Sequence, residues 1–454
     1  TEKALSRNPQ ALRTFNDKMS QCIEAGYFSY LDHYKDATSL DGLQQSYLPL
    51  SYALKDDPLD EDEENQVNHP GKTKARPVSD GSHQADASTP SVNTALVDIP
   101  DIWTEKIQNI LLQFRTSKLL GLADISHYYH RLRLDPLSVS MTRAIFREGG
   151  VGSTGELKVL VAPSASMGLK PVPSLASHCR ARTAALVKDE IAQKTLKASY
   201  CDDVYTLTKW NASEGKVESE MTLLNRTQEI SKALNVCCLE LGGNGWVTDL
   251  NADQIPAKLK DVTGVTTKRA HRDIGVSTTG ALGLRWNLGA DLPEGGTMSY
   301  RVHRPGSLNL LPKRRGQRPP EGELRSRKDI QRFLQTRGLT KASLLGLVMN
   351  LFDALQLALP WTATAKLIYR EILAENPNMS WKSLVPVKYL KRIEDLAVDL
   401  LDLSRDQFFP RRAIHEGQDG TVGFLTLILV HDGCKDSACC LAYIHQQWPK
   451  ESVH

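Results

Sequence analysis

The chain has 454 residues, a length sufficient for two to four subdomains with sizeable cores. Its composition, 41% hydrophobic and 24% charged residues, is ordinary for a soluble globular protein. The formal net charge of +3 is too small to identify a nucleic-acid-binding protein from the totals alone. The eight cysteines lack the paired spacing of a zinc site, so we expect them to be reduced, as in an intracellular protein.

Apolar periodicity predicts the elements of the first half of the chain. Residues 1–40 have a helical pattern that ends near Gly26, and residues 47–82 have a hairpin pattern that an acidic loop at 56–64 interrupts. The elements expected next are a helix at 103–116, a strand at 119–123, a hairpin with strands at 142–147 and 157–161, and a helix at 175–186.

The most informative segment is the tetrad Tyr200-Cys201-Asp202-Asp203. Residues 194–200 alternate with a period of two and predict a strand, and residues 204–208 predict the returning strand. Two adjacent carboxylates at such a turn repel each other, and a divalent cation is the usual compensation because hard cations prefer oxygen ligands. An acidic turn without chemistry is the alternative, since Asp is favoured in turns.

A third carboxylate, Asp124, follows the apolar run 119–123, which predicts a buried strand. Two-metal phosphoryl transfer requires carboxylates that share ions about 3.5–4 Å apart. By itself Asp124 could equally cap the following turn. Together with the acidic pair of the tetrad, it favours the two-metal chemistry.

The second half of the chain is expected to be mostly helical, with strands at its end. The expected elements are a helix at 217–233, a strand at 236–239, an Arg-, Pro- and Gly-rich linker or loop at 303–330, helices at 340–405, and strands at 424–430 and 438–444. Polar residues interrupt the most apolar stretch, 344–359, so we expect a core helix there and no membrane span. His127 and His130 could chelate a metal, but an aromatic-rich turn is the plainer account.

The order of these motifs resembles that of the reverse transcriptases, in particular those of Pao-type (BEL/Pao) LTR retrotransposon polyproteins. Residues 123–125 and the tetrad are similar to the two catalytic motifs of that family. The other similar segments are 75–80 (fingers), 91–93 and 110–115 (before the first catalytic strand), 167–176 (template-facing), 282–287 (primer grip) and 351–360 (the run after it).

The resemblance implies an α+β fold, a right-hand polymerase (fingers, palm, thumb) with an antiparallel palm sheet, followed by a helical connection and the start of a ribonuclease H-like hairpin. In such a palm, helices cover one face of the sheet and the acids lie on the open face. The implied domains are a helical leader at 1–46, fingers and palm at 47–250, palm end and primer grip at 251–302, a basic linker or loop at 303–339, a helical thumb or connection at 340–420, and a truncated ribonuclease H-like start at 421–454. In the last of these, Asp432 would be the first metal-binding acid of the ribonuclease H fold.

The implied function is RNA-directed and DNA-directed DNA polymerisation, by two-metal nucleotidyl transfer from a dNTP to a primer 3′-hydroxyl, to copy retrotransposon RNA. The implied catalytic and metal-binding residues are Asp124, Asp202 and Asp203, which would hold two Mg²⁺ ions, with Mn²⁺ as a substitute. The implied nucleotide-binding residues are Lys72, Arg76, Tyr129, Met167 and Gly168, with Tyr129 excluding a ribose 2′-hydroxyl, and the implied primer grip is Leu282 and Gly283.

The implied partners are an RNA or DNA template with its primer, dNTP, and other polyprotein segments such as a protease and an integrase, without a membrane. The implied location is the cytoplasm, with virus-like particles or the nucleus as further sites. The basic runs 313–315 and 325–328 are candidates for contact with duplex phosphates, although a solvated linker explains them as well.

The alternative is a domesticated or inactive reverse-transcriptase fold that binds nucleic acid or a partner without polymerising. Met167 stands where many retroviral enzymes have Gln, and Ala354 and Gln356 replace the usual Pro and Gly of the family. The three acids are intact, which favours the polymerase. An aspartic peptidase is rejected because the chain has no Asp-Thr-Gly or Asp-Ser-Gly.

Overall fold

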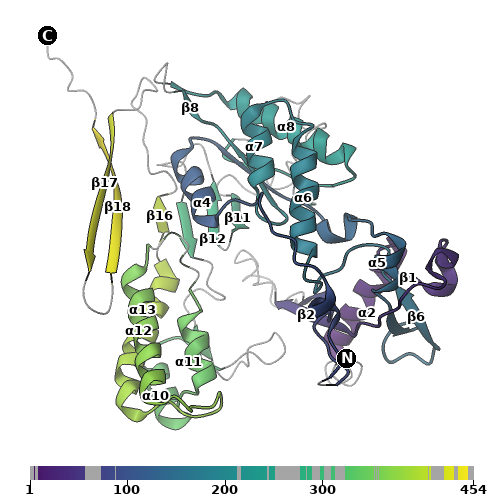
Figure 1. Ribbon diagram of the computed structural model, residues 1–454. Helices are drawn as coiled ribbons and strands as arrows, with labels where there is room; N and C mark the ends of the chain where they lie inside the picture. Colours follow the sequence, from purple (N-terminus) through teal and green to yellow (C-terminus); the bar gives the residue numbers. More distant parts are fainter. Residues whose placement is uncertain are drawn as a thin grey trace, which may run out of the picture.

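The structure is a computed structural model, and Figure 1 shows the arrangement of its elements, coloured along the sequence. It describes residues 5, 9–56, 73–86, 88–211, 216–242, 245–250, 277–282, 284–288, 297–300, 308–311, 323–351, 353, 355, 357–406, 408–410, 424–433 and 438–447. Most of the acidic loop at 56–64 and the basic run at 313–315 lie outside these residues.

A small antiparallel sheet of order β10-β4-β7 lies at the centre of the first half of the chain. Its strands are β4 (Leu120–Asp124), β7 (Asp203–Leu207) and β10 (Val247–Thr248). Both predicted strands next to the acids are therefore confirmed. The middle strand, β4, is a nearly continuous apolar run because it is buried on both of its faces.

Helices cover both faces of this sheet. One face packs against α6 (Val172–Ala184), α7 (Glu190–Ala198) and α8 (Glu220–Val236). On the other face lies α4 (Ile107–Thr116). The centroid of its Phe114 ring is 5.1 Å from the ring centroid of Tyr205 and 5.4 Å from that of Trp286. The prediction that one face of the sheet is open and carries the acids is therefore wrong, because aromatic side chains pack on that face. The acids lie instead at the end of the sheet.

The strand predicted at 194–200 is also wrong, since most of this segment belongs to helix α7. Asp189 caps that helix by accepting the N–H groups of Ile191 and Ala192. Ala192, Thr195 and Leu196 are buried at helical spacing, so burial follows the period of a helix. The strand predicted at 236–239 fails for a similar reason: α8 extends to Val236, and the turn after it has Cys238 at φ 57°.

A second group of elements surrounds the N-terminal helix. Helix α2 (Pro9–Glu24) confirms the helix predicted to end near Gly26, and it buries Ala11, Phe15, Met19 and Cys22. It packs with the sheet of order β1-β6-β5 in a core of its own. The strands here are β1 (Ser29–Tyr30), β5 (Ala144–Arg147), β6 (Leu157–Val161), and the separate pair β2 (Leu50–Asp56) and β3 (Thr73–Ser79). Both predicted hairpins are thus confirmed.

Short elements connect these groups. They are η1 (Leu31–His33), η2 (Ala37–Leu40), α3 (Val92–Ala95), η4 (Tyr128–Arg131), α5 (Pro136–Ser140), β8 (Trp210–Asn211), β9 (Lys216–Val217) and η8 (Val387–Tyr389). Of these, η4 follows Asp124 and bears directly on the site.

The second half of the chain contains a four-stranded antiparallel sheet, a helical bundle and a long hairpin (Figure 1). The strands are β11 (Ser277–Ala281), β12 (Leu284–Leu288), β13 (Thr297–Tyr300), β16 (Phe408–Pro410), the pair β14 (Leu308–Asn309) and β15 (Glu323–Leu324), and the hairpin β17 (Phe424–Gly433) and β18 (Ala438–Gln447). The helices are α10 (Arg327–Thr336), α11 (Lys341–Val348), α12 (Leu359–Glu375) and α13 (Leu390–Asp406). The predicted strands near the C-terminal end are confirmed as this last hairpin.

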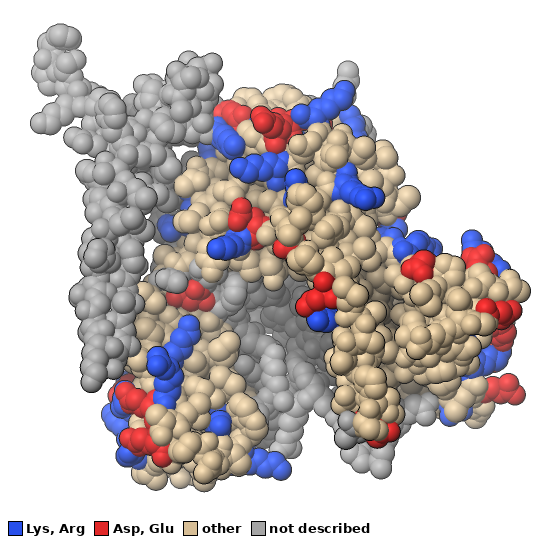
Figure 2. All heavy atoms as spheres, viewed as in Figure 1, with Lys and Arg blue, Asp and Glu red and all other residues tan. Residues whose placement is uncertain are grey.

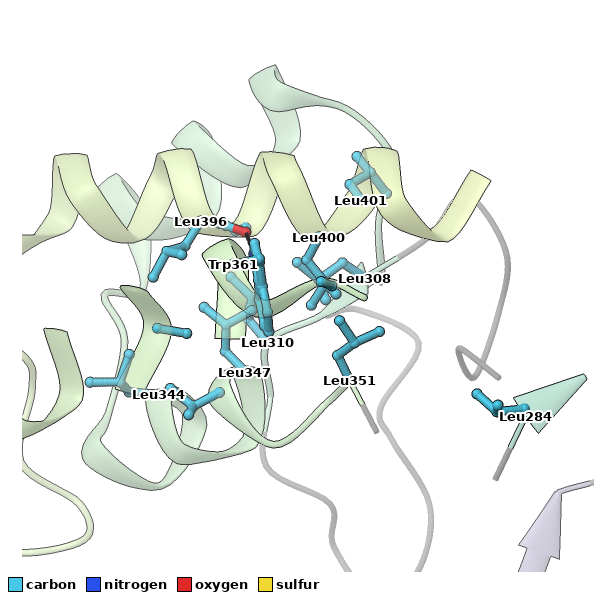
Figure 3. Close-up of a cluster of buried hydrophobic side chains, with 14 of the residues drawn as sticks. Leu284, Leu308, Leu310, Leu344, Leu347, Leu351, Trp361, Leu396, Leu400 and Leu401 are labelled. Carbon is cyan, nitrogen blue, oxygen red and sulfur yellow. Dashed lines mark hydrogen bonds between the residues drawn. The ribbon is translucent and has the colours of Figure 1, made fainter. Parts of the chain in front are cut away.

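Leucine, isoleucine and alanine side chains pack with Trp361 in the core of the helical bundle. Trp361 of α12 lies between Leu347 of α11 and Leu400 of α13, and its Nε1–H donates to the carbonyl of Leu396 at 2.9 Å (Figure 3). The helices predicted at 340–405 are confirmed, but the single core helix expected at 344–359 is wrong, because α11 ends at Val348 and α12 begins at Leu359. Within the described ranges, no helix has the length and apolar character needed to cross a membrane.

Part of the expected basic linker at 303–339 is helical, because α10 begins at Arg327 with Ser326 as its N-cap. The Arg327 guanidinium lies 2.8 Å from the carboxylate of Glu394 and 3.1 Å from that of Asp395, both on α13. This part of the basic run at 325–328 therefore joins two helices of the bundle. Figure 2 shows acidic and basic side chains side by side on that part of the surface.

Candidate active site

One end of the central sheet brings the predicted carboxylate residues together. β4 and β7 are antiparallel, and their register pairs Asp124 with Asp203. The pairing continues into the turn, because the Ile125 N–H donates to the carbonyl of Asp202 at 2.9 Å. Directly paired residues project from the same face of a sheet with Cβ atoms about 4.5–5.5 Å apart. Two carboxylates in this arrangement repel each other, and a bound cation would offset the repulsion.

The tetrad forms a tight turn between α7 and β7. The Asp203 N–H donates to the carbonyl of Tyr200 at 2.9 Å, and Cys201 has φ 49°. A residue other than Gly in the left-handed region costs about 1–2 kcal/mol, so neighbouring contacts must hold this turn. Asp124 is exposed, whereas Asp202 and Asp203 are half-buried. Asp124 is therefore accessible, and Asp202 and Asp203 partly accessible, at one end of the sheet.

Residues 240–242, which the sequence analysis did not single out, border Asp124. The Gly242 N–H donates to the carbonyl of Asp124 at 2.6 Å, and the Ser126 N–H donates to that of Glu240 at 2.8 Å. A Cβ on Gly242 would lie 3.2 Å from Oδ2 of Asp124, so glycine leaves room for this carboxylate. The Gly-Gly pair after an apolar run was the available sequence signal for such a close approach.

The predicted primer-grip turn reaches the same acids. Leu282 lies between β11 and β12 with φ 52°, and its N–H donates to Oδ2 of Asp203 at 3.2 Å. The side chain of Leu282 is buried in the core shared with Trp286. The structure thus brings Leu282 to the site through its main chain, whereas Gly283 lies outside the described residues.

Tyr129, predicted to contact the sugar of a nucleotide, lies beside the turn. It belongs to η4, and its hydroxyl is 4.0 Å from Sγ of Cys201. Burial raises the pKa of the Tyr129 phenol, and Cys201 and Asp202 raise it further. Tyr129 is therefore a neutral, half-buried ring near the acids at physiological pH.

Met167 and Gly168 are held against the end of β3. The Ser79 N–H donates to the carbonyl of Met167 at 2.9 Å, and a Cβ on Gly168 would lie 1.9 Å from the carbonyl oxygen of Ser79. Gly168 has φ 102°, so both the lack of room for a Cβ and the positive φ require glycine at this position. Asn93 strengthens this contact, because its Nδ2 donates to the carbonyl of Gly168 at 2.9 Å and its Oδ1 accepts the Lys170 N–H at 2.8 Å.

The remaining predicted residues are not joined to the site by the described part of the structure. Arg76 is paired with Ala53 in the β2–β3 hairpin, but its side chain lies outside the description, as does the whole of Lys72. Asp432 is paired with Cys439 in the β17–β18 hairpin, and its side chain also lies outside.

The acids fit a metal site by chemistry and register but do not form a closed cage. Carboxylate oxygens are the ligands that Mg²⁺ prefers, and Asp124, Asp202 and Asp203 supply them at one sheet edge. Within the described ranges, however, no group of three or more His, Cys, Asp or Glu residues is gathered closely enough to hold a metal ion. Any ion at this edge would therefore need the carboxylates to converge on it.

The two histidines after Asp124 pack with aromatic rings. The His130 ring is stacked on that of Tyr27 with centroids 5.0 Å apart, and His127 lies 5.5 Å from the same ring. Burial and, to a smaller extent, the neighbouring His127 lower the pKa of His130 to about 4. This arrangement agrees with the aromatic-rich turn and gives no support to a histidine chelate.

Comparisons with known proteins give one family match and structural likenesses to 371 solved chains. Residues 340–454 match the family described as Pao retrotransposon-like RNaseH-like domain, so this part of the chain is similar to a segment of retrotransposon polyproteins. No curated protein matches the chain.

One of these solved structures is the foamy viral protease-reverse transcriptase dRH in complex with double-stranded DNA. The TM-score is 0.45 and the sequence identity 12%, with 96% of this chain and 54% of the viral chain covered. The chain therefore spans about half the length of that protein, and a likeness of this size does not by itself establish a shared fold.

Proposed function

We propose that the chain is an RNA-directed and DNA-directed DNA polymerase that transfers a nucleotide from a dNTP to a primer 3′-hydroxyl. The single observation that carries the proposal is the β4–β7 register, which pairs Asp124 with Asp203 and extends to Asp202. Three carboxylates at one end of the sheet repel each other and destabilise the fold unless a cation offsets the repulsion. A divalent metal ion at a phosphoryl-transfer site is such a cation.

In this proposal Asp124 and Asp202 are the main ligands of two Mg²⁺ ions, with Asp203 completing the set and Mn²⁺ able to substitute. The bound ions would make the 3′-hydroxyl more acidic and stabilise the pyrophosphate that leaves. Asp203 also accepts the Leu282 N–H, so its carboxylate ties the predicted primer grip to the acids. The primer end would thus lie between the turn and the β11–β12 hairpin.

The contacts around the acids support roles for the predicted nucleotide-binding residues. Tyr129 would set its ring against the sugar and exclude a 2′-hydroxyl, which its position beside Cys201 supports. Gly168 would admit the templating base close to the main chain, and its tight contact with Ser79 fixes this loop to β3. Arg76, on the same strand, would neutralise the triphosphate with Lys72.

The family match at 340–454 supports the same context. A segment similar to a retrotransposon polyprotein follows the carboxylate site in the same chain. We therefore propose an RNA or DNA template with its primer as the macromolecular partner, and other segments of a polyprotein as further partners.

A fold that binds nucleic acid without polymerising is the second candidate. The observation that favours it is that the described acids are not gathered into a group able to hold a metal ion. The two candidates differ in whether the acids converge on a metal when primer, template and dNTP are bound.

Primer extension on an RNA template tests the proposal. The unaltered chain should extend the primer with Mg²⁺ or Mn²⁺, Asp202→Asn should lose at least about 100-fold in rate, and both proteins should bind the primer–template. Glu371→Gln is the matched control, because Glu371 is an exposed acid of α12 paired with Arg392, and its loss should leave the rate unchanged. Tight binding without extension by the unaltered chain would support the second candidate.

A further inference from the structure

Arg180 is a fully buried cation of α6 beneath the tetrad. Its exposed fraction is 0%, and a guanidinium in such a place is costly unless its donors are satisfied. Nε donates to the carbonyl of Leu196 at 3.1 Å, Nη1 to that of Cys201 at 2.8 Å, and Nη2 to Oγ1 of Thr104 at 3.0 Å. The three acceptors come from the end of α7, the tetrad turn and the segment before α4, so one side chain links three parts of the chain.

The contact with Cys201 acts on the strained residue of the turn. Cys201 has φ 49°, and its carbonyl belongs to the peptide unit that leads into Asp202. The next carbonyl, that of Asp202, accepts the Ile125 N–H at 2.9 Å. The two carbonyls that flank the Cα of Asp202 are therefore both fixed, one by Arg180 and the other by β4. The backbone direction at Asp202 depends on this pair of hydrogen bonds.

Arg180 also brings a positive charge next to the turn. Its three acceptors are neutral oxygens, so these contacts leave the positive charge of the guanidinium in place next to the turn. Hydrogen bonds from a charged donor are shorter and stronger than neutral ones, which agrees with the 2.8 Å contact to Cys201.

We propose that Arg180 is a positioning residue for the carboxylate site, which holds the turn so that Asp202 can converge with Asp124 on a divalent metal. This inference rests on the proposed function, since it assigns the turn a role in metal binding. It extends that proposal by making the acids depend on a buried side chain of another helix.

Arg180→Lys is the first test, because lysine keeps the charge but cannot reach three acceptors with a planar fork. The protein should fold, with Mn²⁺ affinity, measured by electron paramagnetic resonance, lowered about 10-fold or more and kcat for primer extension lowered about 10–100-fold. KM for dNTP should change less than about 3-fold, since the turn acts on the metal site. Thr104→Val removes a single acceptor and should give the same pattern with a smaller loss, about 2–5-fold.

Arg226→Lys is the matched control. Arg226 is also buried, with 3% exposure, and donates to a main-chain carbonyl of β7, that of Leu207 at 2.9 Å, at the far end of the strand from the acids. A purely structural role of Arg180 predicts that both lysine variants lower the unfolding temperature and activity alike. The positioning role predicts that Arg226→Lys keeps the Mn²⁺ affinity of the unaltered protein within about 2-fold.

The outcomes separate this inference from the proposed function. Unchanged Mn²⁺ affinity in folded Arg180→Lys and Thr104→Val would overturn the inference, as would an equal loss in Arg226→Lys. The unaltered protein could bind Mn²⁺, with an affinity that Arg180→Lys lowers, and yet not extend primers. That result would support the inference and overturn only the proposed polymerase activity. If the unaltered protein neither binds Mn²⁺ nor extends primers, both are overturned.

Discussion

Replacement of the buried His130 by phenylalanine should remove a specific sensitivity of the fold to acid. The imidazole is 8% exposed and stacked on Tyr27, and within the described structure its Nδ1 has no hydrogen-bond partner. Burial, the largest cause, lowers its pKa from 6.5 to about 4. The folded protein therefore keeps this ring neutral at a pH where the unfolded chain already protonates it.

The sign follows from the bound protons. Between pH 6.5 and about 4 the unfolded state carries one proton more at this residue, so the free energy of unfolding falls as the pH falls. A shift of this size corresponds to about 3 kcal/mol in full, of which about 2 kcal/mol is lost between pH 7 and pH 5. His130→Phe keeps the stacked ring and abolishes this contribution, whereas the carboxylates titrate in both proteins.

Urea unfolding at pH 7 and pH 5 measures the difference. The unaltered protein should lose about 2 kcal/mol more than His130→Phe over this interval. His33→Phe, which replaces an exposed histidine, is the control and should behave as the unaltered protein does. Equal losses in His130→Phe and the unaltered protein would refute the reasoning and show that the folded state accommodates the charged ring.

Three further predictions concern a close contact at Gly168, the core of the helical bundle and the proposed metal. Gly168→Ala should lower the free energy of unfolding by at least about 2 kcal/mol in urea unfolding, because its Cβ would lie 1.9 Å from the Ser79 carbonyl; a loss below about 0.5 kcal/mol would contradict the close contact. Leu400→Ala should cost about 2–5 kcal/mol in the same assay, since Leu400 is 0% exposed in the bundle core, and a near-neutral result would show that the bundle closes the cavity. Primer extension should stop on addition of EDTA and return with Mg²⁺ or Mn²⁺, and activity that persists in EDTA would exclude a dissociable metal.

The sequence was a good guide wherever a local pattern decides the structure. β4 is buried on both faces, so a continuous apolar run marked it and placed Asp124 at its end. The hairpin of β5 and β6 and the helices at 340–405 were predicted for the same reason, since burial follows the period of the element.

The pattern misled where two periods fit one short segment. Leu196, Ala198 and Tyr200 alternate as in a strand, but the buried residues of α7 are Ala192, Thr195 and Leu196. The decisive signal was Asp189, a helix N-cap that precedes the segment. The pairing of β7 with β4, which lies far upstream in the sequence, needed the whole fold, as did the contact of Arg180 with Cys201.

Localised cleavage by Fe²⁺ bound in place of Mg²⁺ tests the central claim most directly. Fe²⁺ with ascorbate and peroxide generates radicals that cut the main chain close to the ion. If the acids at the ends of β4 and β7 hold one metal site, the chain should be cut near both Asp124 and Asp202, and Asp202→Asn should abolish both cuts together. Cuts at only one of these places, or cuts that survive the substitution, would contradict a shared site.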